Sequence, residues 1–93
     1  MEKNNRSSLA QRLLSAADLP AELAPGTPKL TVIGCSEVTI EGHRGLVEYT
    51  GERITSNCGK YLVTVKGSGL TISAMDREDM LISGVIFSVE YVY

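Results

Sequence analysis

The sequence predicts a small all-β domain, a sandwich or barrel of about seven short strands, preceded by a short helix. From Lys29 onward, turn signals recur every eight or nine residues, a spacing typical of short strands. The chain has 93 residues and is 43% hydrophobic, yet it contains no Trp and only one Phe. Its core must therefore consist of Val, Ile and Leu, which favour strands. The expected strands cover residues 29–34, 37–42, 45–50, 52–57, 60–66, 69–75 and 80–92.

Residues 1–28 are expected to hold an N-terminal helix and a Pro-rich linker, with the β domain covering residues 29–93. Ser8 and Gln11 have the spacing of a capping box. An apolar stripe at helical spacing runs through Leu9, Ala10, Leu13, Leu14 and Ala17. Proline and glycine in the linker end this helix. A helix so short is marginal alone, so we expect it to dock on its own sheet, on a partner or on a membrane.

Residues 38–50 carry the most regular pattern and predict a β-hairpin. Val38 and Ile40 alternate with polar residues, as in a half-buried strand. Gly42 and Gly45 bracket a His-Arg pair, and glycine supplies the positive φ angles that a tight connection needs. The expected result is a hairpin with a polar tip.

A second hairpin is expected around Gly67, and Gly84 is expected to bend the long last strand. The segment 38–46 also weakly resembles the segment 63–70. Such an echo is compatible with two hairpins of one type or with a β-solenoid-like stack. We favour the hairpins, and the stack remains the alternative.

The composition argues against several classes of protein. A net charge of −2 provides no basic surface for nucleic acid. No apolar run approaches the roughly 20 residues of a membrane span, and the N-terminus lacks the apolar core of a signal peptide. We therefore expect a cytoplasmic location. Cys35 and Cys58 lack metal-site spacing, so we expect two free thiols at strand ends or turns, with no role of their own.

No motif for nucleophilic catalysis, phosphate binding or dinucleotide binding is present in the sequence. His43 is the single histidine, and a histidine in a turn is usually solvated, so we expect His43 and Arg44 to be exposed. Residues 76–79 predict a charged loop or a single helical turn without the spacing of a calcium loop. The expectation is a protein with no enzymatic activity, no cofactor and no metal site.

Several segments together carry a resemblance to a known family. They are Leu19-Pro20, PKLTVIG (28–34), VTIEGHRGL (38–46), YLVTVKG (61–67) and ISGVIFSVEY (82–91). In this order they resemble the YabP/YqfC family of sporulation proteins, and the His-Arg-Gly-Leu turn is the most specific part. The short leading helix and the Leu-Pro pair favour the YqfC branch.

The resemblance implies a non-enzymatic protein of endospore-forming bacteria, made in the mother cell during sporulation. It also implies an immunoglobulin-like β-sandwich. YqfC-like proteins are typically encoded beside a membrane protein, YqfD, which implies a membrane partner of that kind. The chain would then be peripheral at a membrane through its partner, and a homo-oligomer remains open.

Two functions therefore remain. The first is an interaction or assembly module whose contact turn consists of His43, Arg44 and Gly45. The alternative is a small anion- or lipid-head-group-binding β domain that uses the same turn. An arginine beside exposed turn amides is suited to hold an anion.

Overall fold

Lys29 begins the first of six strands in the computed structural model, which describes residues 26–93. The strands are β1 (Lys29–Ile33), β2 (Glu37–Glu41), β3 (Leu46–Tyr49), β4 (Arg53–Asn57), β5 (Leu62–Met75) and β6 (Asp79–Val92). The all-β prediction is confirmed, since all six elements of this part of the chain are strands. The predicted helix over residues 9–17 and most of the linker lie outside the described residues.

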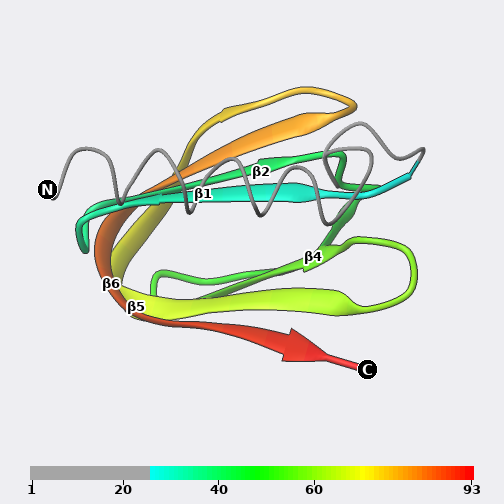
Figure 1. Cartoon of the computed structure of the whole chain (residues 1–93). Coiled ribbons are helices and arrows are strands. Elements are labelled where there is room, and N and C mark those ends of the chain that lie inside the picture. Colours follow the sequence, from blue (N-terminus) through cyan, green and yellow to red (C-terminus); the bar gives the residue numbers. More distant parts are fainter. Residues whose placement is uncertain (1–25) are drawn as a thin grey trace, which may run out of the picture.

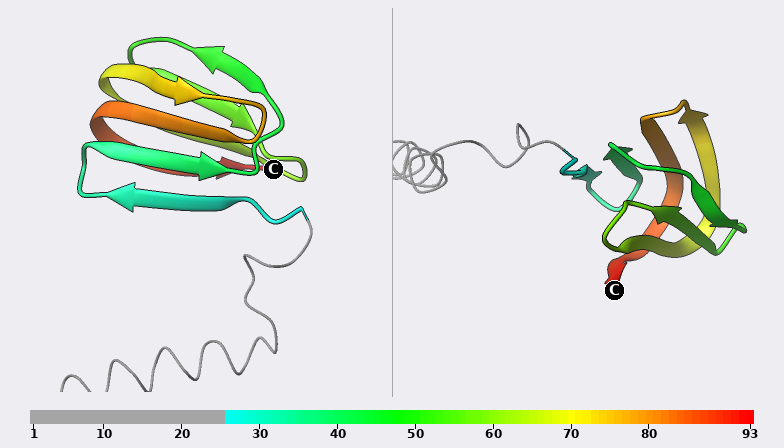
Figure 2. Two further views of the ribbon diagram at one scale, coloured as in Figure 1. Left: turned by 90° about the horizontal axis from the view of Figure 1, so that it is seen from above. Right: turned by 90° about the vertical axis from the view of Figure 1, so that its right-hand side faces the viewer.

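The strands form one antiparallel sheet in the order β1-β2-β6-β5-β4-β3. The long strands β5 and β6 curve strongly, so the sheet folds over on itself into two layers (Figure 1). β1 and β2 lie beside the first half of β6 in one layer, and β3 and β4 lie beside the first half of β5 in the other. Figure 2 shows this arrangement from above and from the side. The core lies between the two layers.

The two layers differ from an immunoglobulin-like sandwich in that they share strands and belong to one sheet. The predicted strands 60–66 and 69–75 are the two halves of one strand, β5. The domain therefore has six strands where about seven were predicted, and the prediction of a hairpin around Gly67 is wrong. The β-solenoid-like stack is also wrong, because all five strand pairs are antiparallel.

Two glycines allow the central strands to bend. A Cβ atom on Gly67 would overlap the carbonyl oxygen of Val85, and one on Gly84 would lie 2.7 Å from the carbonyl oxygen of Gly69. The backbones of β5 and β6 therefore approach too closely here for any side chain. Gly84 also has a φ of 141°, a value that favours glycine. The expected bend at Gly84 is confirmed.

The predicted hairpin over residues 38–50 is wrong. β2 pairs with β1 and β6, whereas β3 pairs only with β4 at the far edge of the sheet. Residues 42–45 are therefore a crossover between the layers. Pairing with β6 places Val38 beside Ile82 and Ile40 beside Met80, and all four side chains are buried. Glycine permits a tight connection, but long-range burial decides which strands pair.

The core is small and aliphatic, as expected from the composition. Its buried members are Val38, Ile40, Ile54, Cys58, Val63, Val65, Leu70, Met80 and Ile82. Both cysteines are free, and they lie at a turn and at a strand end as predicted. Their environments differ, because Cys35 is exposed in the β1–β2 turn and Cys58 is only 3% exposed. Cys58 is therefore a core residue, whereas Cys35 is not.

Candidate functional site

The crossover at residues 42–45 is fixed to both layers by its backbone. The amides of Gly42 and His43 donate to the carbonyl oxygen of Glu78, at 2.6 and 3.1 Å, in the β5–β6 turn. The amide of Arg44 donates to the carbonyl oxygen of Asn57, at 2.7 Å, at the end of β4. The crossover is therefore a rigid bridge rather than a free hairpin tip.

Gly45 completes the attachment to β4. Its carbonyl oxygen accepts hydrogen bonds from the Asn57 amide at 2.9 Å and from the Ser56 hydroxyl at 3.2 Å. Its own amide donates to Nδ1 of His43 at 3.1 Å. The φ of Gly45 is 136°, so a side chain at this position would strain the backbone.

His43 is buried, with 5% of its surface exposed, so the prediction of a solvated turn histidine is wrong. Its Nδ1 accepts the Gly45 amide proton, which places the ring proton on Nε2. Nε2 lies 2.9 Å from the carbonyl oxygen of Asp76 and 3.3 Å from that of Asp79. Both ring nitrogens are therefore engaged by the backbone, and the imidazole anchors the crossover to the β5–β6 turn.

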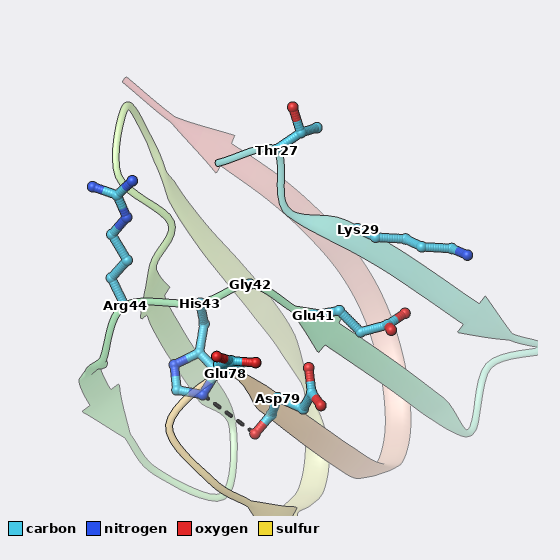
Figure 3. Close-up of a pocket in the computed structure, with 8 residues that line it drawn as sticks. All are labelled: Thr27, Lys29, Glu41, Gly42, His43, Arg44, Glu78 and Asp79. Atoms are coloured by element: carbon cyan, nitrogen blue, oxygen red, sulfur yellow. Dashed lines mark hydrogen bonds between the residues drawn. The ribbon is translucent and has the colours of Figure 1, made fainter. Parts of the chain in front are cut away.

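Arg44 is exposed, as predicted. Figure 3 shows its side chain extending away from the carboxylates of Glu41, Glu78 and Asp79. A Cβ atom on Gly59 would lie 3.3 Å from Cζ of Arg44, so the guanidinium rests against this glycine. No ion pair involving Arg44 is found among residues 26–93. Of the predicted pair, His43 is therefore a buried anchor and Arg44 is an exposed cation.

A hollow of about 650 Å³ lies beside the crossover (Figure 3), and we call it the acidic hollow. It is lined by Thr27, Lys29, Glu41, Gly42, His43, Arg44, Glu78 and Asp79. The predicted charged loop at residues 76–79 is the turn between β5 and β6. Within the described part of the chain, no cluster of three or more acidic, His or Cys side chains is placed to hold a metal ion.

Asp76 organises that turn. Its Oδ1 accepts the amides of Asp79, at 2.7 Å, and Glu78, at 2.9 Å. These two hydrogen bonds, the Asp79 one foremost, hold the pKa of the Asp76 carboxyl below its ordinary value. The carbonyl groups that His43 contacts therefore belong to a turn that the Asp76 side chain itself stabilises.

A second hollow, of about 400 Å³, lies on the other side of Arg44, and we call it the basic hollow. Its lining consists of Gly26, Thr27, Pro28, Arg44, Cys58, Gly59, Lys60 and Tyr61. Two cations and no carboxylate line it, in contrast to the acidic hollow. Sequence reasoning missed Lys60 and Thr27, because they are 16 and 17 residues from Arg44 and no local pattern joins them.

Comparison with known proteins supplies the family. A sequence model of the YabP family matches residues 25–93. The uncharacterized protein YqfC of Bacillus subtilis (strain 168) is 28% identical over 80 residues, which cover 86% of this chain and 86% of that protein. No solved structure matches significantly. Among residues 26–93, none forms a helix of the length and apolarity that crossing a membrane requires.

Proposed function

The chain belongs to the YabP family, and from this membership and the crossover geometry we propose that it is a sporulation protein of endospore-forming bacteria that acts as a non-enzymatic interaction module. It acts in the cytoplasm of the mother cell and attaches to a membrane through a protein partner similar to YqfD. The resemblance of the turn VTIEGHRGL (38–46) to YabP/YqfC proteins supports this assignment.

The observation that carries the proposal is the presentation of Arg44. Its backbone is fixed by Asn57 and its neighbour His43 is locked in the fold, so the guanidinium is displayed from a rigid base. A preorganised contact loses less conformational entropy on binding. Arginine is also enriched among the residues that dominate protein interfaces. Arg44 is therefore the contact residue, and His43 and Gly45 are positioning residues.

The state of His43 supports a non-enzymatic role. A general base needs a free nitrogen within hydrogen-bond distance of the proton that it removes. Nδ1 of His43 accepts the Gly45 amide proton, and Nε2 faces two carbonyl oxygens. The imidazole therefore has no nitrogen to offer to a substrate without breaking the crossover.

The test compares partner recovery by parent protein and the Arg44→Ala variant, with a YqfD-like membrane protein from the same host as bait. Arg53→Ala is the matched control, because Arg53 is an exposed arginine on β4 whose pair with Glu48 is long, at 4.0 Å. We expect Arg44→Ala to melt like the parent but to recover several-fold less partner and to lower the yield of heat-resistant spores. Equal recovery by all three proteins would disprove the contact role of Arg44.

The basic hollow favours a second candidate function, the binding of a small anion or lipid head group. Arg44 and Lys60 both line it without a carboxylate, so an anion would relieve the repulsion between like charges. Arginine binds phosphate or carboxylate groups through two parallel hydrogen bonds. The Thr27 hydroxyl is a further donor at the rim.

Inorganic phosphate and vesicles containing phosphatidic acid distinguish the sources of such an anion. A ligand at about 100 times its Kd stabilises the folded state by roughly 2.7 kcal/mol, which a thermal shift detects. We expect the shift to disappear in Arg44→Ala and in Lys60→Ala, and to persist in Arg53→Ala. A shift with vesicles alone would indicate a lipid head group, and no shift with either would remove this candidate.

A further inference from the structure

One side of the core is left open between two edges of the sheet, β1 and the second half of β6. At one end of this side the β1–β2 turn is hydrogen-bonded to β6. The Ile86 amide donates to the carbonyl oxygen of Cys35 at 2.7 Å, and the Gly84 amide donates to that of Ser36 at 3.1 Å. Beyond this point β1 pairs only with β2 in the sheet that the described residues form. We call the gap between the two strands the open seam.

The other end of the open seam is marked by aromatic rings. Pro28, immediately before β1, lines the basic hollow together with Tyr61. The Tyr61 ring centroid lies 5.2 Å from that of Tyr91 and 5.8 Å from that of Tyr93. β1 therefore runs beside the last part of β6 from the tyrosines to the β1–β2 turn. The chain enters the domain at the tyrosine end.

Side chains along the open seam belong to the core face but are not covered. Val32 pairs with Val38 and Tyr91 pairs with Val63, so each lies on the inner face of its strand. Val38 and Val63 are fully buried, whereas Val32 is 50% exposed and Tyr91 is 53% exposed. Burial is thus complete one strand inside the seam and only partial at its two edges, where Leu30 and Val89 still pack partly against the core.

The opposite side of the core, between β3 and the second half of β5, is also bridged by two hydrogen bonds. The Ile72 amide donates to the hydroxyl of Tyr49 at 3.1 Å, which joins the two layers. The Leu70 amide donates to the carbonyl oxygen of Gly51 at 2.8 Å in the β3–β4 turn. On the inner face of this side Tyr49 is 48% exposed and Met75 is 46% exposed, so both sides of the core are partly open. The open seam differs in that the chain enters the domain beside it.

We propose that the chain's own N-terminal segment, residues 9–17, docks as a helix in the open seam. The apolar stripe of this segment is aliphatic, which suits Val32 and the tyrosine rings. Its predicted length of about 14 Å matches the roughly 17 Å of a five-residue strand such as β1. Eight residues separate Ala17 from Gly26, and they span up to about 26 Å when extended, so the helix can reach along the whole seam.

The chain's own segment is favoured over a second copy or another protein because it is tethered at the seam. The described residues begin at Gly26, which lines the basic hollow with Tyr61 at the tyrosine end. A short tether raises the local concentration of the segment to about the millimolar range. A free partner would have to exceed this concentration or bind more tightly to displace the segment.

A spin label on Cys35 tests the proposal in the full chain. Cys35 is exposed at the hydrogen-bonded end of the seam and Cys58 is only 3% exposed, so the native protein offers one reactive thiol. We expect the label to broaden the amide NMR signals of residues 9–17 in dilute protein. No broadening would overturn the proposal. In a second sample, spin-labelled chains without isotope are mixed with unlabelled chains that are isotopically enriched. Broadening in this mixture would show contact with a second copy and overturn the proposal.

Two matched pairs of variants test both surfaces of the proposed contact. Leu13→Glu adds a charge on the apolar stripe, whereas Gln11→Glu adds the same charge off the stripe and keeps the capping box. Val32→Asp adds a charge in the seam, whereas Thr31→Asp adds it on the outer face of β1. We expect Leu13→Glu and Val32→Asp to abolish the broadening and to lower the Tm by about 5 °C.

The control variants Gln11→Glu and Thr31→Asp should keep both the broadening and the Tm of the parent. Broadening that survives in Leu13→Glu or in Val32→Asp would contradict the proposed contact. If Val32→Asp fails to fold, the Leu13→Glu and Gln11→Glu pair still decides, because both changes lie outside the β domain.

Discussion

Nε2 of His43 lies 2.9 Å from the carbonyl oxygen of Asp76, although 33 residues separate them in the sequence. This contact joins the crossover between the layers to the turn between the two central strands. Because the Gly45 amide occupies the other ring nitrogen, one side chain contacts three backbone groups and joins two segments. The position of Arg44 depends on this arrangement.

Replacing His43 should therefore destabilise the protein. His43→Ala leaves a cavity and removes the partners of the Asp76 carbonyl and the Gly45 amide, and we expect a loss of about 2–4 kcal/mol in the free energy of unfolding. Urea denaturation measures it. Arg44→Ala is the matched control, since Arg44 is exposed, and should change stability by less than about 0.5 kcal/mol. Equal stability of the two variants would contradict the anchoring role.

The close approach of β5 and β6 at Gly67 leads to a second prediction. Gly67→Ala places a methyl group against the carbonyl oxygen of Val85, a backbone atom that cannot move without opening the β5–β6 pair. We expect a loss of more than about 3 kcal/mol, or failure to fold. Gly51→Ala is the control, because nothing lies within 4 Å of its added Cβ atom. Melting curves of the two variants should differ clearly, and similar curves would show that the bend is adaptable.

Asp76 makes stability depend on pH in a definite direction. The Asp79 and Glu78 amides lower the pKa of its carboxyl below the ordinary value of 3.8 in the folded state. The unfolded chain therefore binds this proton first, and the stabilisation is present above pH 3.8 and lost as the pH falls through the folded pKa. Asp76→Asn keeps an oxygen acceptor but removes the charge.

We expect the parent to be more stable than Asp76→Asn at neutral pH and nearly equal to it once the pH has fallen below the folded pKa of the carboxyl. Urea midpoints of both proteins across this range measure the difference. A constant difference across the range would show that the turn does not use the ionised carboxylate.

The two cysteines should respond differently to the same substitution. Cys58→Ser replaces the thiol by a more polar hydroxyl beside Ser56 in an otherwise aliphatic core, and we expect a loss of about 1–2 kcal/mol. Burial raises the pKa of the Cys58 thiol, so alkylating reagents should modify it only after unfolding. Cys35→Ser, in the exposed turn, should leave the melting temperature unchanged in reducing buffer. Thermal melts and the mass of the alkylated protein check both expectations.

The sequence by itself determined where the strands lie and which side chains face inward. Val38 and Ile40 are fully buried as their alternation predicts, and Gly84 bends its strand. These features depend on neighbours along the chain, because a strand exposes alternate residues to opposite faces. The exposure of Arg44 could likewise be predicted from its neighbours along the chain.

Only the tertiary structure decided which strands pair, and with this the environment of the candidate site. A Gly-x-x-Gly connection fits a hairpin and a crossover equally well. It is a crossover here because β2 pairs with β6 instead of with β3. His43 is buried because Asp76 and Asp79, more than 30 residues away, meet it across the fold. Gly67 likewise looked like a turn, yet β6 keeps β5 continuous through it. Such outcomes depend on burial between distant segments, which no local pattern of residues encodes.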